Sequence, residues 1–381
     1  MSTNHSYHLS FWEEEAFFQS IDFLVIGAGI VGLHAALHLK QQSPKAHIVV
    51  VDRGSLPIGA STRNAGFACF GSMTELLDDL TVHSESEVWD LVDRRFRGLK
   101  RLRSNLGDAA LHYEGLGGYE LFRPEDETTY EKCLDHLNAF NRRLAAITGE
   151  KETFCRRDGD LLKMGFRGVR HLIWNRLEGQ IHTGWMMRHL IERVHRSGVL
   201  LLGGMGITGI QSGTVLLNGG WRLQPRRILV ATNGFARQLM PELPVSPARN
   251  QVLITEKIPG LPVKGTFHYD AGYVYFRHVG DRILLGGGRN QSTDEETTDQ
   301  FGFSDTIQAY LRKLLHEVVL PDRGEIPIAR WWSGILGVGE RKKPLVQWVN
   351  DQTVVAVRLG GMGVAIGALL GEEAADLLME C

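Results

Sequence analysis

The sequence DFLVIGAGIVG, at residues 22–32, joins a short apolar run to a glycine-rich segment. The apolar run is typical of a strand that is buried on both faces of a parallel sheet. A helix is expected from about Ile30 to Lys40, where Ser43-Pro44 stops it. A second buried strand is expected from His47 to Val51, and Asp52 ends it. The first fifty residues therefore predict a strand–helix–strand unit.

Three glycines in this unit follow the pattern G-x-G-x-x-G between strand and helix. Gly27 allows a tight turn, Gly29 lets the backbone approach a pyrophosphate, and Gly32 permits close packing of helix and strand. The helix start offers free N–H groups to phosphates, and the Asp52 carboxylate can accept hydrogen bonds from a ribose diol. We therefore predict a dinucleotide site. The Asp52 carboxylate would repel the 2′-phosphate of NADP, and the neighbouring Arg53 weakens this argument only slightly. The residues of the predicted site are Gly27, Gly29, Ile30, Gly32, Asp52 and Arg53.

Three further segments favour FAD over NAD. The loop GASTRNAG at 59–66 is small and polar and suits a pyrophosphate and a flavin edge. A buried strand ends at Thr232-Asn233-Gly234, and LGGMGV at 359–364 leads into the last helix. A helix start stabilises the negative charge that develops on a reduced flavin, and a nicotinamide enzyme does not need this third box. The residues assigned on this basis are Ser61, Thr62, Arg63, Asn64, Ala65, Gly66, Thr232, Asn233, Gly234, Gly360, Gly361, Met362, Gly363 and Val364.

Strand–helix alternation returns near the middle and at the end of the chain, with β-rich segments between. Helices are expected over 84–104, 128–148, 185–197, 304–319 and 364–379, and strands over 119–122, 199–202, 215–217, 221–223, 227–230, 249–256, 273–279, 282–285 and 353–359. The segment 203–210 is glycine-spaced. We expect an α/β fold: a Rossmann-type FAD-binding domain with a parallel sheet, and a β-rich α+β substrate domain made from insertions. The expected division is 20–72, 152–240 and 345–381 for the first, 73–151 and 241–344 for the second, and 1–19 as an extension.

These glycine boxes together resemble the D-amino-acid-oxidase-type FAD-dependent oxidoreductases, a superfamily that includes glycine oxidase, sarcosine oxidase and gamma-glutamylputrescine oxidoreductase. Ser10-Phe11-Trp12 and the run 59–66 most resemble the last of these. The resemblance implies that Ile207 contacts the adenine through its backbone, that 64–66 lie near the isoalloxazine, and that 361–364 lie near its pyrimidine end. Members with covalent flavin use a His before the Ala-Gly of the first box or a Cys before the last strand. Asn64 takes the first place and no Cys lies between Cys155 and Cys381, so non-covalent FAD is implied.

The substrate side is expected on the hairpin that carries Tyr275-x-Arg277, turns at Gly280-Asp281 and continues with RILLGGG. Tyr275 and Arg277 share one face of a strand, where an arginine can grip a carboxylate or pair with an acid structurally. Trp332, in the sequence WWSG, resembles a Trp-x-Gly that lies close to the flavin in relatives; a core aromatic is the alternative. The catalytic candidates are therefore Tyr275, Arg277 and Trp332.

One departure from the resemblance affects the substrate. In D-amino-acid oxidases the Gly of that motif is followed by Leu-Arg-Pro, whose Arg binds the substrate carboxylate, whereas this chain has Ile335-Leu336-Gly337. The following stretch is GERKKP at 339–344, in which Lys342 and Lys343 either face the site or belong to a solvated charge run. An ordinary α-amino acid is therefore in doubt as the substrate.

We expect oxidation of a small amine or amino acid by hydride transfer to flavin N5, giving an imine, with dioxygen or a quinone as electron acceptor. His182, His268 and His278 are either proton relays or structural histidines. The alternatives are an NAD-dependent dehydrogenase, a flavin-bearing subunit of a larger dehydrogenase complex, and oxidation of a hydroxy acid or polyol.

Composition limits the other classes. A net charge of −2 gives no field that would attract nucleic acid. The N-terminus lacks the pattern of a secretory signal, and no apolar run is long enough to span a bilayer. Cys69, Cys133, Cys155 and Cys381 are dispersed without metal-site spacing, which indicates reduced thiols, no metal centre and a cytoplasmic protein.

Overall fold

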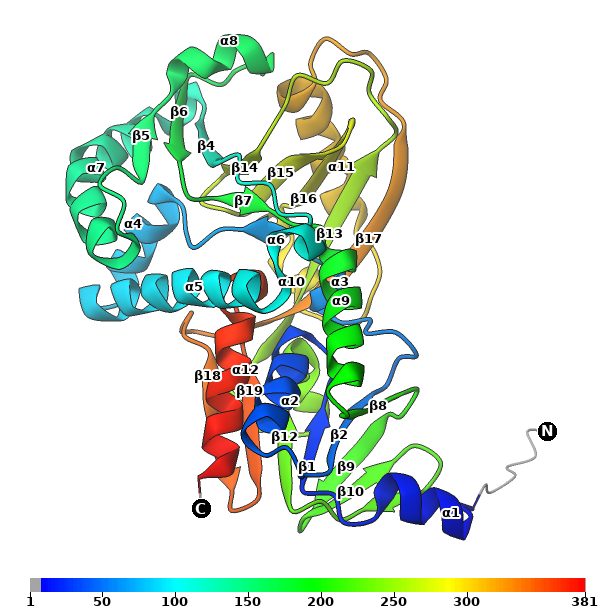
Figure 1. Cartoon of the computed structure of the whole chain (residues 1–381). Helices are drawn as coiled ribbons and strands as arrows, with labels where there is room; N and C mark the ends of the chain where they lie inside the picture. Colours follow the sequence, from blue (N-terminus) through cyan, green and yellow to red (C-terminus); the bar gives the residue numbers. More distant parts are fainter. Residues whose placement is uncertain (1–7, 381) are drawn as a thin grey trace.

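A six-stranded sheet forms the base of the molecule, in the computed structural model that describes residues 8–380 (Figure 1). Its order is β18-β19-β12-β1-β2-β8, and only β18 is antiparallel to its neighbour. The strands are β1 (Phe23–Ile26), β2 (Ile48–Asp52), β8 (Leu200–Gly203), β12 (Arg227–Val230), β18 (Leu345–Asn350) and β19 (Thr353–Val357). Ile26 is in register with both Val51 and Val230, so the carboxyl ends of these strands meet at one edge. The predicted α/β fold with a parallel sheet is confirmed.

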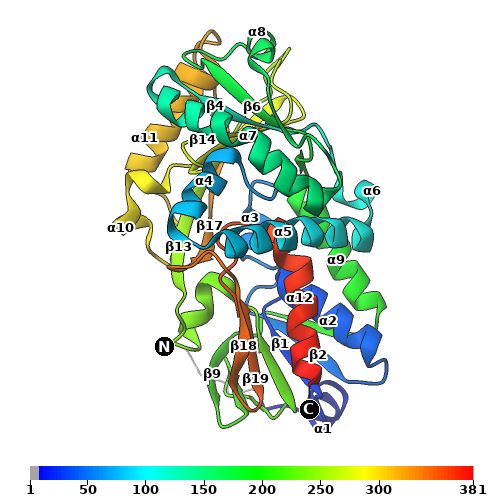
Figure 2. The same ribbon diagram turned by 90° about the vertical axis from the view of Figure 1, so that its left-hand side faces the viewer.

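Three helices cover one face of this sheet: α2 (Ile30–Gln42), α9 (Thr183–Arg196) and α12 (Gly363–Met379). Figure 2 shows α12 beside α2, with α5 (Glu85–Leu106) crossing the start of α12. The helices approach closely because small residues lie at the crossings: a Cβ on Gly371 would collide with α2, and one on Gly98 with α12. The opposite face is covered by β9 (Ile207–Gln211), β10 (Thr214–Leu217), β11 (Arg222–Leu223) and the 3₁₀ turn Asn233–Gln238.

The second lobe is an eight-stranded sheet of order β17-β13-β16-β15-β14-β4-β6-β5. The strands are β17 (Ile328–Val338), β13 (Ser246–Thr255), β16 (Arg282–Gly287), β15 (Val274–Val279), β14 (Thr266–Tyr269), β4 (Gly118–Phe122), β6 (His171–Asn175) and β5 (Phe154–Arg156). One face is an apolar core that includes Phe267 and Phe276. Because neighbours along a strand point to opposite faces, His268 and Tyr275, which are register partners, lie on the other face.

The remaining elements are short or surround this sheet. They are α1 (Phe11–Glu13), a π-helix (Glu14–Phe18), α3 (Ala60–Arg63), β3 (Phe67–Ala68), α4 (Met73–Val82), α6 (Asp108–Leu111), α7 (Glu127–Thr148), α8 (Leu161–Met164), β7 (Gly179–Gln180), α10 (Thr293–Glu296), α11 (Asp305–Leu314), a second π-helix (Leu315–Val319) and 3₁₀ turns at Pro124–Asp126, Asp158–Asp160 and Arg289–Gln291. Between residues 8 and 380 we find no helix whose length and apolar character would carry it across a bilayer.

Most expected elements are present, and two differ. Residues 203–210, expected only as a short glycine-spaced segment, contain most of strand β9 (Ile207–Gln211), and the helix expected over 304–319 ends in a π-helical turn. Strands β5 and β6 lie in the range 152–240 that the sequence assigned to the FAD-binding domain, but they pair with β4 in the eight-stranded sheet. The domain division otherwise stays a prediction. The expected extension is described only from residue 8, and Cys381 lies outside the described residues.

A buried histidine in α2 predicts acid sensitivity. His34 is 1% exposed, and its Nδ1 donates to the Ile30 carbonyl at 2.8 Å. Its Nε2 has no partner among residues 8–380, and burial lowers the pKa of His34 to about 4. Because the unfolded chain binds this proton below pH 6.5 and the folded chain only near 4, stability falls as pH drops through that window, by roughly 3 kcal/mol. Urea unfolding of wild type and His34→Leu at pH 7 and pH 4.5 measures this. The leucine variant should lose less stability on acidification; an equal loss would contradict the assignment.

Candidate functional site

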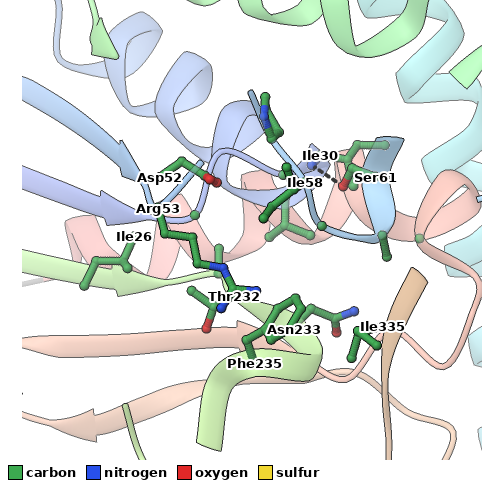
Figure 3. Close-up of a pocket in the computed structure, with 18 of the residues that line it drawn as sticks. Ile26, Ile30, Asp52, Arg53, Ile58, Ser61, Thr232, Asn233, Phe235 and Ile335 are labelled. Carbon is green, nitrogen blue, oxygen red and sulfur yellow. Dashed lines mark hydrogen bonds between the residues drawn. The ribbon is translucent and has the colours of Figure 1, made fainter. Parts of the chain in front are cut away.

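The first cavity, of about 320 Å³, opens at the carboxyl edge of β1, β2 and β12 (Figure 3). Residues from all the predicted glycine boxes line it, although they are far apart in the sequence. The predicted residues that line this cavity are Gly27, Gly29, Ile30, Asp52, Arg53, Ser61, Asn64, Ile207, Thr232, Asn233, Gly361, Gly363 and Val364. The fold therefore brings together segments from residues 27 to 364 around one space.

Asp52 shapes the first glycine turn. Its Oδ2 accepts a hydrogen bond from the Ala28 N–H and its Oδ1 one from the Gly54 N–H, both at 2.9 Å. Gly27 has φ +108°, a conformation that L side chains rarely adopt, so the turn needs glycine there. A carboxylate oxygen can accept more than one hydrogen bond, so Asp52 can hold the turn and still accept from a ribose hydroxyl.

The loop 59–66 is tied to the start of α2. The Ile30 N–H donates to Ser61 Oγ at 2.9 Å, the interaction drawn in Figure 3. Arg53 reaches across the cavity, with its guanidinium carbon 3.8 Å from the centre of the Phe235 ring and Nη1 3.2 Å from Gln238 Oε1. The cavity wall thus presents a glycine backbone on one side and a cation held over an aromatic ring on the other.

Asn233 has a role that the sequence did not reveal. Its backbone is left-handed (φ 48°), and its Oδ1 accepts hydrogen bonds from the N–H groups of Arg358 (3.0 Å) and Leu359 (3.3 Å). It therefore fastens the end of β12 to the C-terminal glycine box, in addition to lining the cavity. Three assigned residues, Gly32, Thr62 and Gly234, line neither this cavity nor the one described next.

Packing explains these three positions. A Cβ on Gly32 would collide with the Gly27 carbonyl, and one on Gly234 with the carbonyl of Leu336. Thr62 Oγ1 donates to the Pro57 carbonyl at 2.7 Å, inside its own loop. These residues shape the site and do not line it.

A second cavity, of about 530 Å³, continues from the first toward the eight-stranded sheet. The two share five lining residues: Ala60, Asn64, Leu336, Gly361 and Val364. Predicted residues that line the second are Arg63, Asn64, Ala65, Gly66, Tyr275, Gly360, Gly361, Met362 and Val364. The segments 59–66 and 360–364 therefore lie at the junction, where the resemblance expected the isoalloxazine.

The far wall of the second cavity carries His268 and Tyr275. The Phe67 ring packs edge-on against both, with centroid distances of 5.2 Å to His268 and 5.6 Å to Tyr275. Burial raises the pKa of Tyr275, so its hydroxyl stays protonated. His268 Nε2 lies 2.9 Å from Glu178 Oε2, and this carboxylate holds the pKa of His268 up at about 9 against the opposing effect of burial.

The hypothesis that Arg277 grips a substrate carboxylate needs correction. Arg277 is 7% exposed and does not line the second cavity. Its Nε donates to the Ala65 carbonyl at 2.5 Å and its Nη2 to the Ile181 carbonyl at 3.1 Å, while burial lowers its pKa to about 10. It therefore ties the loop 59–66 to the sheet.

Trp332 also lies outside the lining of both cavities. Its Nε1 donates to the Arg63 carbonyl at 2.9 Å, so it anchors the loop 59–66 from β17. Of the three catalytic candidates, only Tyr275 lines the second cavity.

Of the histidine and lysine candidates, only His268 and Lys342 line the second cavity. His268 lines the cavity, whereas His182 caps α9 by accepting the Trp185 N–H, and His278 accepts the Gly265 N–H and lies 3.2 Å from Glu114. Lys342 lines the cavity and pairs with buried Asp79 at 2.5 Å. Lys343 lines only a small neighbouring pocket.

Among the described residues, one group brings three metal-ligating atoms within 4.8 Å of one another: Cys69, Glu178 and His268. Two of the three already form an ion pair, and burial raises the pKa of the Cys69 thiol well above its usual range. We therefore assign no metal to them.

Comparison with known proteins agrees with this geometry. The family model of FAD-dependent oxidoreductases (DAO) matches residues 22–377, so the chain belongs to that family of FAD-binding enzymes. The chain is 25% identical over 325 residues to a bifunctional protein ThiO/ThiG of Trichormus variabilis, which covers 82% of this chain and 45% of the relative; the chain thus spans about half of that protein.

Solved structures agree in fold. Iminodiacetate oxidase of Chelativorans sp. BNC1 superposes with a TM-score of 0.74 at 20% identity, covering 94% of this chain and 95% of its own. Glycine oxidase of Geobacillus kaustophilus gives 0.74 at 18% identity, with 94% of both chains covered. The family match confirms the predicted superfamily and FAD, and it sets aside the NAD-dependent alternative.

Proposed function

We propose that this protein is an FAD-dependent oxidase or dehydrogenase that oxidises the C–N bond of a small amine or amino acid to an imine. One observation carries the proposal: two adjoining cavities, which share lining residues from the segments 59–66 and 360–364, lead from the carboxyl edge of β1, β2 and β12 to Tyr275 and His268. The first part suits an adenine dinucleotide and the second a small substrate. Glycine oxidase and iminodiacetate oxidase, which share the fold, are named for substrates that carry an amine.

The residues present fit FAD. Gly29 lines the cavity beside the start of a 13-residue helix, where N–H groups and the helix dipole favour a pyrophosphate. Gly363, the first residue of α12, places a second helix start at the junction. When bound, FAD accepts the hydride from the carbon that bears the amine. The chain's own residues hold the cofactor, exclude water from the joined cavity and orient the amine.

Non-covalent attachment is supported by the same residues. Asn64 stands where covalent relatives have histidine, and its Nδ2 donates to the carbonyls of Ala60 and Ser61. Cys69 is the one described cysteine that lines either cavity, and its raised pKa keeps the thiol protonated and unreactive. Acid precipitation should therefore release all the flavin into the supernatant.

Charges of both signs line the second cavity. The cations are Arg63, Arg289, Arg341, Lys342 and Arg358, and the carboxylates are those of Glu75, Asp78, Asp79 and Glu340. Arg63 and Arg358 are already bonded to main-chain carbonyls, and Lys342 pairs with Asp79. The cavity therefore offers carboxylates to the ammonium group of either an amine or an amino acid.

The test is anaerobic mixing of the purified flavoprotein with glycine, iminodiacetate, benzylamine and putrescine, and with glycolate and glycerol as hydroxyl-bearing comparators. We expect at least one amine to bleach the flavin absorbance and the hydroxyl compounds to leave it unchanged. Reduction by glycolate or glycerol alone would favour hydroxy-acid or polyol oxidation. Reduction by none, with turnover only after a partner is added, would favour a subunit of a larger complex.

Reoxidation identifies the electron acceptor. Reduced protein is mixed with air-saturated buffer or, without oxygen, with a soluble quinone, and the faster return of absorbance assigns dioxygen or quinone. We infer a cytoplasmic location from the dispersed cysteines, of which the three described ones are free.

A further inference from the structure

One residue in the wall of the second cavity, His268, belongs to a buried ion pair that the proposed hydride transfer does not use. His268 is 6% exposed and Glu178 is 1% exposed, and their Nε2 and Oε2 atoms are 2.9 Å apart. His268 comes from β14 and Glu178 from the loop between β6 and β7. The pair thus lies on the cavity face of the eight-stranded sheet, next to Tyr275.

The hydrogen bonding decides which ring nitrogen of His268 is available. Nε2 is turned to Glu178, whose Oε2 also accepts a hydrogen bond from Thr266 Oγ1 at 3.1 Å. Within residues 8–380, Nδ1 has no hydrogen-bond partner, and His268 lines the cavity. In the neutral form of the imidazole, a carboxylate that fixes Nε2 as the protonated nitrogen leaves Nδ1 as a proton acceptor for a molecule in the cavity. This is the arrangement by which an acid orients a histidine base.

We propose that His268 is the catalytic residue that takes the proton of the substrate ammonium, and that Glu178 is its positioning residue. This rests on the proposed function. The ammonium N–H bond breaks, its electron pair stays on nitrogen, and the proton goes to His268 Nδ1. The neutral amine then gives up the hydride of its α-carbon, with two electrons, which bound FAD would accept, and nitrogen and carbon become the iminium ion, the protonated form of the imine.

The charges around His268 bring its pKa close to that of the substrate ammonium whose proton it would accept. Glu178, Glu75 from α4 and Glu120 from β4 all raise the pKa of His268, to about 9, while burial lowers it. Glu120 is itself buried and accepts hydrogen bonds from Ser72 and Thr74, and burial raises its pKa. The Cys69 thiol and the Tyr275 hydroxyl stay neutral beside them. A base of pKa about 9 takes a proton from an alkylammonium of about 10 at little cost.

The first experiment compares flavin reduction rates from pH 6 to 10 in wild type, His268→Gln and Glu178→Gln, with glycine, benzylamine and putrescine as substrates. The matched control is His278→Gln, a buried histidine on the next strand that also faces an acid but does not line the cavity. In wild type, the rate constant of flavin reduction by each amine should rise with pH and level off above an apparent pKa near 9. This rising limb should be common to all active amines. His268→Gln should lose that limb, and its rate of flavin reduction should fall about 100-fold, which is within the usual size of a general-base effect. In Glu178→Gln the limb should move to lower pH.

The second experiment needs no substrate. The protein is labelled with ¹³C-histidine, and the NMR signal of His268 is assigned as the one that is missing from His268→Gln. This signal is then followed as the pH of the holoprotein is changed. It should titrate near pH 9 in wild type and at lower pH in Glu178→Gln, which keeps the test decisive even where His268→Gln fails to fold. Titration of His268 at or below 6.5 in wild type would overturn the proposal.

The two proposals fail in different ways. If amines reduce the flavin of His268→Gln at the wild-type rate and with the same limb, His268 is not the proton acceptor and the amine assignment stands. If no amine reduces wild type at any pH, the proposed function fails, and the role of His268 fails with it.

Discussion

Gly29→Asp should lower the affinity for FAD by at least 100-fold, which corresponds to about 2.8 kcal/mol, while the fold persists. The substitution is compatible with the backbone, because Gly29 does not have a positive φ, and a Cβ at this position meets only Ser61 Oγ, at 3.1 Å, which must move by a few tenths of an ångström. The carboxylate would lie where the helix start of α2 faces the cavity, and it would repel a pyrophosphate there. Fluorescence titration of the apoprotein with FAD measures the loss.

A matched control separates charge repulsion from general damage. Gly209→Asp introduces the same side chain on strand β9, where a Cβ meets only the Leu216 side chain at 3.7 Å and neither cavity is reached. It should keep FAD affinity within about twofold, a change of about 0.4 kcal/mol or less. Circular dichroism should give the wild-type spectrum for both variants. Normal FAD binding by Gly29→Asp would remove the first cavity from the cofactor site.

Arg277→Met should destabilise the protein by roughly 3 kcal/mol and weaken FAD binding as well. The guanidinium satisfies the carbonyls of Ala65 and Ile181, and an unsatisfied buried acceptor costs about 1–3 kcal/mol. Ala65 belongs to the loop at the junction of the cavities, so the loss of this tie loosens the cofactor site. Urea unfolding at a fixed excess of FAD gives the free energy of unfolding.

The control is Arg289→Met, an arginine that lines the second cavity and packs near the Tyr273 ring. Its loss should change stability by no more than about 0.5 kcal/mol, as for most surface substitutions. A carboxylate-gripping Arg277 would behave otherwise, raising KM for glycine but not for benzylamine and leaving stability unchanged. That pattern would restore the hypothesis that the structure led us to correct.

The sequence predicted the parts of the fold that depend on neighbouring residues. The apolar run before Gly27, the glycine spacing and the acid at Asp52 are all local, and they gave β1, α2, β2 and the first cavity correctly. Helix α4 was missed although Ser72 and Glu75 form a capping box, a signal that could have located its start. The boundary error at β5 and β6 arose because pairing with β4 is a long-range contact.

The substrate side was harder to predict because its contacts join distant segments. Alternation placed Tyr275 and Arg277 on one face correctly. Tyr275 lines the cavity, whereas the guanidinium of Arg277 donates its hydrogen bonds to main-chain carbonyls more than ninety residues away. Glu178 and His268 are separated by ninety positions, and no motif links them. The second role of Asn233 also depends on residues that follow it by 125 positions or more.

The order of strands in the six-stranded sheet has a consequence for biosynthesis. Strand β1 pairs with β12, which follows it by about two hundred residues, and helix α2 packs against α12, which follows it by more than three hundred. A ribosome must therefore synthesise the chain through α12 before this layer can assemble. Such long-range pairing slows folding and exposes apolar segments meanwhile. During translation, apolar residues such as Val25 and Leu33 stay exposed and can aggregate, so we expect chaperones to bind the nascent chain.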